Sequence, residues 1–329
     1  MTDTAFDVLG IGNAIVDVIA ETTDAFLDEQ KLDKGIMRLI DEDEAARLYG
    51  VMGPGIEVSG GSAANTIAGV AALGGRANFI GRVRDDELGD VFAHDIRAQG
   101  VSFASAQAKD GPLTARCLVL VTPDAQRTMN TYLGACIQLS ARDVDRDAIA
   151  ASRAVYLEGY LWDAPEGPAI FAEAAHAAAA AGREVAMTLS DPFCVDRYRD
   201  DFLAFIREHV DILFANEIEI ASLYQVESFE EAARRSSEDV RIAALTRSEK
   251  GSVIVAGSGR TVIGAHPTRV VDTTGAGDLY AAGFLYGYAT GASLERAGRI
   301  GSVCAGEIIS HIGARPRANL RTLIAEQLG

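Results

Sequence analysis

The chain has 329 residues, 48% of them hydrophobic and 23% charged, which is enough for a large buried core. Its net charge of −17 argues against nucleic acids and anionic membranes as partners, because like charges repel. The start of the chain lacks the basic segment of a signal peptide and no apolar run reaches the ~18 residues that span a bilayer, so we expect a cytoplasmic protein.

The first hundred residues predict short strands mixed with helices. Residues 6–17, FDVLGIGNAIVD, predict a strand that ends at Gly and Asn, and the polar stretch 21–50 indicates strand and amphipathic helix together. Small residues at 60–75, GGSAANTIAGVAALGG, predict the start of a helix. A strand with a following loop is expected over 76–89, and a helix closed by Gly100 over 90–100.

The remaining chain predicts a regular α/β pattern. Residues 114–135 predict two strands joined at Pro123-Asp124. Beyond them, strands expected at 154–160, 184–191, 210–216, 241–248 and 251–257 alternate with helices expected at 168–182 and 198–209. Such alternation indicates a mainly parallel sheet with helices on both faces. We therefore expect one α/β domain over residues 1–329, with a small β-rich lid formed by about 15–60 and 101–138.

In an open parallel sheet, ligands bind beyond the carboxyl ends of the strands. The residues that follow the predicted strands are polar, acidic and rich in amides: Asn13, Asp17, Arg127, Asn216, Glu219, Asp272 and the run Gly275-Ala276-Gly277-Asp278.

The segment VVDTTGAGDLYAAGFLYGYATG, residues 270–291, joins a carboxylate to a glycine turn and an apolar helix. A helix that begins at Gly275 leaves the amides of Gly275, Ala276 and Gly277 free to hold an anion. Asp278 falls in the first turn, where the helix dipole favours its ionised form. It could accept the proton of a hydroxyl that attacks a phosphoryl group held by those amides. The alternative is an ordinary helix start capped by Thr273 or Thr274.

The stretches DTTGAGD and GGSAANTIAGVAALGG resemble the two signatures of the ribokinase-like (PfkB) carbohydrate kinase family, in the family's order and about 200 residues apart. Asn216 to Glu219 resembles the family's Asn-x-x-Glu motif. The resemblance covers essentially the whole chain and implies a ribokinase-like fold. Within the family, GIGNAIVDV, the stretch 25–49 and QRTMNTYLGA look closest to the adenosine kinase branch.

The resemblance assigns the substrate side of a kinase site. Asp278 would be the base toward a primary hydroxyl, and Gly275, Ala276 and Gly277 would form the anion hole. Asp17 would hold two sugar hydroxyls, since a carboxylate can accept from both. The remaining substrate-binding candidates are Asn65, with Gly60 and Gly61 allowing the backbone to approach the sugar, and Asn13.

The same resemblance implies ATP and Mg²⁺. Asn216 and Glu219 would organise Mg²⁺ and phosphate, largely through water. Thr246 and Gly251 match the stretch where the family passes the nucleotide; a plain strand–turn–strand is the alternative. Arg127 would reach over the phosphates when the lid closes, or else lie solvated on the surface. A monovalent cation such as K⁺, common in the family, would belong near Asp272 and Gly313.

The substrate stays open between several molecules. The resemblance also makes Tyr160 and Leu161 substrate-binding candidates. Adenosine kinases usually place an aromatic residue where Leu161 falls, so Tyr160 or Trp162 could hold the base instead, and GGSAAN is the more general sugar-kinase form. Adenosine is favoured, as in purine salvage, with ribose, fructose or another nucleoside as alternatives. A non-catalytic nucleoside- or sugar-binding relative would be expected to lack Asp278 or the Asn-x-x-Glu motif.

Two other enzyme classes fit poorly. Ile15 stands where a dinucleotide fingerprint requires its third glycine, and the chain has no P-loop motif. The sequence thus predicts an ATP-dependent phosphotransferase, as a monomer or homodimer.

Overall fold

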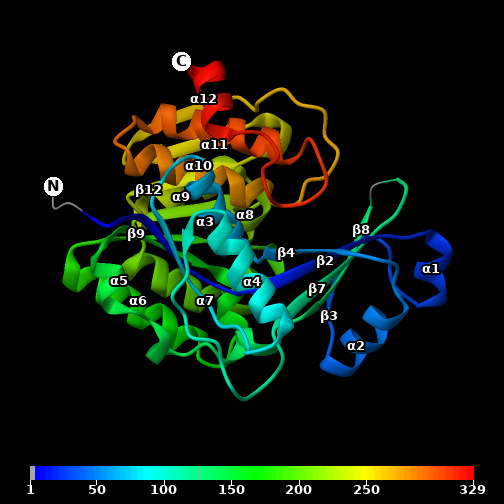
Figure 1. Ribbon diagram of the computed structural model, residues 1–329. Coiled ribbons are helices and arrows are strands. Elements are labelled where there is room, and N and C mark those ends of the chain that lie inside the picture. Colours follow the sequence, from blue (N-terminus) through cyan, green and yellow to red (C-terminus); the bar gives the residue numbers. More distant parts are fainter. Residues whose placement is uncertain (1–3, 125) are drawn as a thin grey trace.

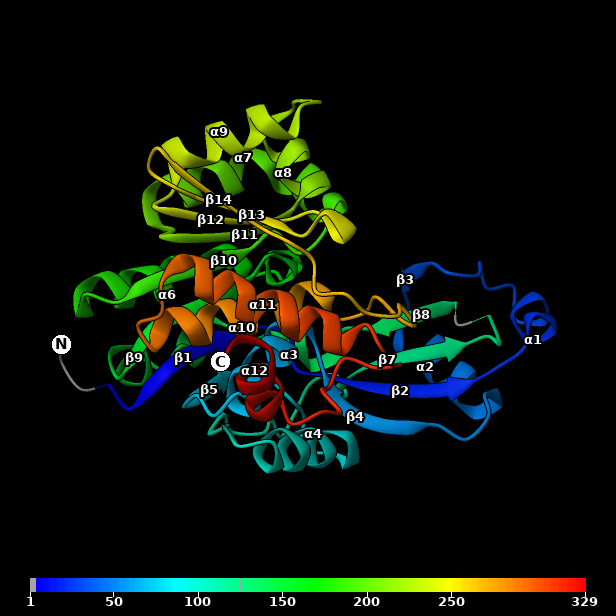
Figure 2. The same cartoon turned by 90° about the horizontal axis from the view of Figure 1, so that it is seen from above.

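The computed structural model describes residues 4–124 and 126–329 and contains two sheets. A nine-stranded sheet has the order β14-β13-β12-β11-β10-β9-β1-β5-β6, and a five-stranded sheet has the order β3-β8-β7-β2-β4. The small sheet extends from one side of the large one, and its far end carries α1 (Figures 1 and 2). The predicted mainly parallel sheet with an additional β-rich part is confirmed.

The large sheet consists of β1 (Phe6–Ile11), β5 (Ala77–Ile80), β6 (Val101–Ser102), β9 (Ser152–Glu158), β10 (Glu184–Thr188), β11 (Ile212–Asn216), β12 (Ile242–Thr246), β13 (Ser252–Ala256) and β14 (Gly259–Ile263). Its neighbours pair in parallel from β6 to β12, whereas β13 and β14 pair antiparallel. The parallel strands place their carboxyl ends along one edge, where ligands bind in such sheets.

Helices cover both faces of the large sheet, and β9 to β12 are mostly buried and apolar for that reason. In β1, Val8 belongs to one core and Leu9 to the other. The core of Val8 includes α3 (Ser62–Ala72), α4 (Glu87–Ala98), α10 (Ala276–Ala289), α11 (Leu294–Ile308) and α12 (Leu320–Leu328). The core of Leu9 includes α5 (Arg146–Ala150), α6 (Gly167–Ala181), α7 (Pro192–His209), α8 (Glu217–Tyr224) and α9 (Phe229–Asp239).

The small sheet, which we call the lid, contains β2 (Ile15–Glu21), β3 (Met37–Leu39), β4 (Ile56–Gly60), β7 (Ala115–Val121) and β8 (Arg127–Tyr132). Leu27 of α1 (Asp24–Glu29) and Leu48 of α2 (Glu42–Val51) belong to the same core as Val16, Val18, Leu118 and Leu120 of the lid. The first predicted lid segment, 15–60, contains three of these strands.

The second predicted lid segment, 101–138, is too long at its beginning. Val101–Ser102 is β6, which pairs with β5 at the edge of the large sheet. The helix α4 returns the chain to that edge, so these residues complete a β–α–β unit before the chain enters the lid at β7.

No helix in the described part of the chain has the length and apolar character that crossing a bilayer requires. Cys117, Cys136, Cys194 and Cys304 are all free and buried, as reduced structural thiols are.

Candidate active site

The turn before α10 has a left-handed residue, Gly275, at its end. Gly275 is the N-cap residue with φ of 74°, a left-handed conformation that favours glycine, and no side chain of the described residues caps the helix. The alternative of a threonine cap is therefore wrong. A Cβ added to Gly277 would meet no described residue within 4 Å, so open space lies beside this glycine. The amide of Ala276 donates to Thr273 O (3.2 Å). One of the three amides predicted to bind an anion is therefore already hydrogen-bonded.

Asp278 is held by two side chains from the first turns of α3. Ser62 Oγ donates to Asp278 Oδ1 (2.7 Å) and Asn65 Nδ2 donates to Asp278 Oδ2 (2.9 Å). Burial raises the pKa of the Asp278 carboxyl, while these hydrogen bonds and the nearby Arg315 charge act in the opposite direction. The expectation that the helix dipole favours the ionised form is outweighed by burial. A raised pKa suits a group that must accept a proton.

Arg315 lies in the loop between α11 and α12 and was not predicted. Its Nη1 donates to Asn65 Oδ1 and its Nη2 donates to Ser59 Oγ (3.0 Å). Its Nε is buried and has no hydrogen-bond partner among the residues that the structure describes. The guanidinium thus lies among Ser59 at the end of β4, Asn65 on α3 and, through Asn65, Asp278 on α10.

Asp17 lies on β2, and its carboxylate fills the space beside Gly60. A Cβ on Gly60 would come within 2.5 Å of Asp17 Oδ2, so a glycine is required there. Gly61 has φ of 96°, and its Cβ would meet Asn13 O at 2.1 Å. Burial raises the pKa of Asp17 to about 6, with Asp278 adding to the increase and Arg315 and Arg127 opposing it. The electrostatic influence of Asp278 on Asp17 indicates that the two carboxyl groups lie in the same region.

Glu158, at the end of β9, connects the turn after β1 to the start of α3 and was also missed. Its carboxylate accepts from the backbone amides of Asn13 (2.7 Å) and Ala63 (2.6 Å). Burial raises the pKa of Glu158 to about 7, against the two amide hydrogen bonds. Asn13 is therefore positioned through its backbone. The rule that picked residues after strands applies to Glu158 as well and could have found it.

Arg127 of β8 forms a buried ion pair with Asp272, which overturns the alternative of a solvated surface arginine. Its Nη1 lies 3.0 Å from Asp272 Oδ2, and the two side chains are 7% and 4% exposed. Asp272 also accepts from the amides of Thr274 (3.0 Å) and Gly313 (3.0 Å). Both carboxylate oxygens of Asp272 are thus hydrogen-bonded, and the monovalent-cation site near Asp272 and Gly313 stays a prediction.

Asn216 and Glu219 bond mainly to each other. Asn216 Oδ1 accepts from the amides of Ile218 and Glu219, both at 2.8 Å, and Glu219 Oε2 accepts from the Asn216 amide (2.9 Å). Burial raises the pKa of Glu219 to about 7. No group of three His, Cys, Asp or Glu side chains in the described part of the chain could hold a metal directly. This donor set fits a hydrated Mg²⁺ held mostly by phosphates and water.

Thr246 ends β12, and Gly251, with φ of 83°, begins the antiparallel return along β13. They form a strand–turn–strand at the same sheet edge as Asn216, because β11 and β12 pair in parallel.

The residues considered for an adenine contact differ in position. Leu161 and Trp162 belong to the buried core beneath α6 and α7, and Trp162 packs edge-on against Phe171 (4.7 Å between ring centroids). Neither is available to a ligand, so the assignment of Leu161 is wrong. Tyr160 is half-buried, and its backbone amide donates to Ser190 Oγ (3.2 Å).

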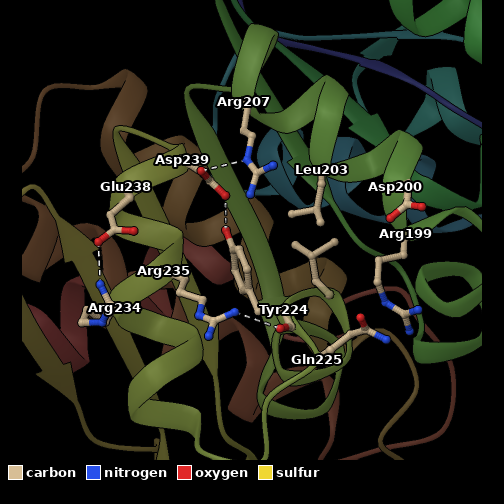
Figure 3. A pocket seen from close by; sticks show the side chains of 11 residues that line it. Arg199, Asp200, Leu203, Arg207, Tyr224, Gln225, Arg234, Arg235, Glu238 and Asp239 are labelled. Atoms are coloured by element: carbon tan, nitrogen blue, oxygen red, sulfur yellow. Dashed lines mark hydrogen bonds and ion pairs between the residues drawn. The ribbon is translucent and has the colours of Figure 1, made fainter.

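A separate cavity of about 380 Å³ lies between α7, α8 and α9 (Figure 3). Its arginines are already bonded: Arg207 to Asp239, Arg234 to Glu238 and Arg235 to the carbonyl of Tyr224. None of the predicted site residues lines it. We assign this cavity no role in the chemistry.

Known proteins match most of the chain in sequence and in fold. The model of the pfkB family carbohydrate kinases matches residues 55–320. An adenosine kinase structure from Sinorhizobium meliloti is 53% identical, with a TM-score of 0.91 over 98% of this chain and 99% of that one. A probable sugar kinase structure from Rhizobium etli is 51% identical, with a TM-score of 0.92 and coverage of 98% of both chains.

A further relative is named for a different substrate. The ATP-dependent ribose-1-phosphate kinase of Halopiger xanaduensis is 30% identical over 259 residues, which cover 78% of this chain and 82% of that protein. Matching signatures, the shared fold and the Asp278 site agree: the chain belongs to the PfkB carbohydrate kinase family and is a kinase.

Proposed function

We propose that the protein transfers the γ-phosphoryl group of ATP to the 5′-hydroxyl of adenosine. The observation that carries the proposal is the carboxylate of Asp278, held by Ser62 and Asn65 next to Gly277, which borders open space. The 53% identity to the Sinorhizobium meliloti adenosine kinase supports adenosine over other substrates.

In the proposed reaction, Asp278 accepts the proton of the 5′-hydroxyl while the oxygen of that hydroxyl bonds to the γ-phosphorus. The bond between that phosphorus and the oxygen bridging to ADP breaks, and ADP leaves. The raised pKa of Asp278 favours proton acceptance, and the amides at the start of α10 face the charge on the transferring group. Asp17 accepts hydrogen bonds from the ribose hydroxyls and orients the sugar.

Mg²⁺ bound with ATP would offset phosphate charge, its water shell held by Asn216 and Glu219. Arg127 would leave Asp272 and bind the phosphates as the lid closes, while Thr246 and Gly251 border the nucleotide. Lid closure would exclude water and so limit wasteful hydrolysis of ATP.

A free sugar is the second candidate substrate. It is favoured by the 51% identity to the probable sugar kinase of Rhizobium etli and by the core position of Leu161, which removes one expected support for a base. The site described around Asp278 would serve a ribose or fructose hydroxyl equally well.

A substrate panel separates the candidates. Purified protein with MgATP receives adenosine, another nucleoside, ribose, ribose 1-phosphate or fructose in separate reactions, and release of ADP is followed. Turnover concentrated on adenosine supports the proposal, and turnover on a free sugar replaces it. Failure of every candidate, with ligand still bound, would favour the non-catalytic relative.

A further inference from the structure

The loop between α11 and α12 brings a guanidinium to the substrate side of the site. Glu307 Oε1 accepts from the amides of Arg317 (2.9 Å) and Ala318 (2.8 Å) and lies 3.1 Å from His311 Nε2. Gly313 donates to Asp272. The loop is thus fastened on both sides of Arg315, so that its side chain is presented from a fixed backbone.

The contacts of Arg315 continue as a chain of hydrogen bonds. Asp95 on α4 accepts from Ser59 Oγ (2.5 Å), Ser59 Oγ accepts from Arg315 Nη2 (3.0 Å), and Arg315 Nη1 donates to Asn65 Oδ1. Asn65 Nδ2 then donates to Asp278 Oδ2 (2.9 Å). A guanidinium has donors alone, so it can bond only the oxygen end of the amide.

We propose that Arg315 is a positioning residue for phosphoryl transfer: it fixes the Asn65 amide so that the NH₂ group, not the oxygen, faces Asp278. A reversed amide would turn an acceptor toward the carboxylate and repel it. This inference rests on the proposed function of Asp278 as the base.

The positive charge of Arg315 also affects the ionisation of Asp278. The charged and titratable groups that act on Asp278, or on which it acts, are Asp17 of β2, Glu158 and Tyr156 of β9, Tyr160, Glu219 of α8 and Arg315. Arg315 is the basic group in this described set. Its loss leaves a cluster of acids, so the carboxylate of Asp278 becomes harder to form.

The test compares Arg315→Met with Arg317→Met, an exposed arginine on the same loop. We expect Arg315→Met to lower kcat by roughly tenfold to a hundredfold, the effect of losing a charged hydrogen bond, while KM for ATP is little changed. The acidic limb of the kcat/KM profile should move to higher pH by about one unit, the lower range for losing a nearby opposite charge. Arg317→Met should do neither. An unchanged kcat and pH profile in a folded Arg315→Met variant would overturn the proposal.

A double-mutant cycle shows whether the effect passes through Asn65. Adding Arg315→Met to Asn65→Ala should lower kcat no further, because the amide that Arg315 orients is already gone. Fully multiplicative effects would mean that Arg315 acts independently of Asn65. If Arg315→Met does not fold, Arg315→Lys keeps the charge but cannot bond Ser59 and Asn65 together, and it takes the place of Met in the cycle.

A spectroscopic measurement keeps this inference apart from the proposed activity. In ¹⁵N-labelled, ligand-free protein the Asn65 side-chain NH₂ resonance, identified by its loss in Asn65→Asp, should shift in Arg315→Met and stay in Arg317→Met. An unmoved resonance in Arg315→Met would overturn the positioning role. A wild-type protein inactive on every substrate would instead contradict the proposed function, and the resonance would still decide the role of Arg315.

Discussion

The two halves of the candidate site are built differently. On the substrate side, Asp278 is bound by side chains of α3, and Arg315 arrives from the last loop of the chain. On the nucleotide side, Asn216 and Glu219 satisfy each other within a single turn. The substrate side therefore depends on the whole fold, whereas the nucleotide side is a local structure that the phosphates and their metal must complete. Mutations should affect the first side more strongly than the second.

The largest effect is expected for Asp278→Asn. Loss of the base should lower kcat by ~10²–10⁴-fold, the range for removing a general base, with KM for adenosine little changed because the isosteric amide keeps the shape of the site. Steady-state kinetics check this. Near-normal turnover would show that Asp278 is not the base, and it would contradict the expectation that mutations on the substrate side have the larger effect.

The second effect concerns the join between the lid and the segment before α10. Arg127→Met leaves Asp272 buried without its charge partner, which should lower the free energy of unfolding by ~3–5 kcal/mol. Urea denaturation measures this. The control is Arg116→Met on the adjacent strand β7, whose guanidinium lies 5.8 Å from the Tyr49 ring, with an expected loss of ~1 kcal/mol. An equal decrease in the free energy of unfolding in both variants would show that the ion pair between Arg127 and Asp272 does not stabilise the fold more than an ordinary arginine contact.

The third effect links substrate binding to pH. Because the pKa of Asp17 is raised to about 6, its carboxylate is present above that pH and is lost as the pH falls through it. KM for adenosine should therefore rise below pH 6 in the wild type. Asp17→Asn should raise KM by about tenfold at neutral pH, through a weakened hydrogen bond to the ribose, and should flatten this pH dependence. A wild-type KM constant down to pH 5 would contradict the assignment.

The smallest effect is expected on the nucleotide side. Asn216→Ala removes the cap of α8, a change of about 1 kcal/mol in stability, and should raise KM for ATP by a few fold without altering KM for adenosine. Ser228→Ala, at the cap of α9, should cost similar stability and leave both KM values unchanged. A change in kcat as large as that of Asp278→Asn would erase the difference between the two halves.

The sequence predicts the fold and the parts of the site that are contiguous in the chain. The alternation of strands and helices, the glycine turn at 275–277 and the first-turn position of Asp278 all follow from local patterns. Leu161 was misassigned because a motif comparison places a residue in a sequence register but does not tell which way its side chain points.

Contacts between distant segments could not be predicted. Arg315 and Arg317 stand in the same stretch, ARPRANL, yet one joins the site and the other is exposed. Similarly, the pairing of Arg127 with Asp272 joins positions 145 residues apart, and no local pattern marks either partner. Their roles follow from the way the loops meet at the sheet edge, which is a property of tertiary structure.

The long spans of these contacts bear on how the protein is made. The strand β1 lies inside the sheet and pairs with β9, so it lacks one neighbour until residue 158 has been synthesised. Ser62 bonds to Asp278 across 216 positions, and Asn65 bonds to Arg315 across 250. Asp17 and Asn65 therefore leave the ribosome long before Asp278, the proposed catalytic base, has been synthesised. Folding dominated by such distant contacts is slow, and the ability to use ATP arises only with its last segments.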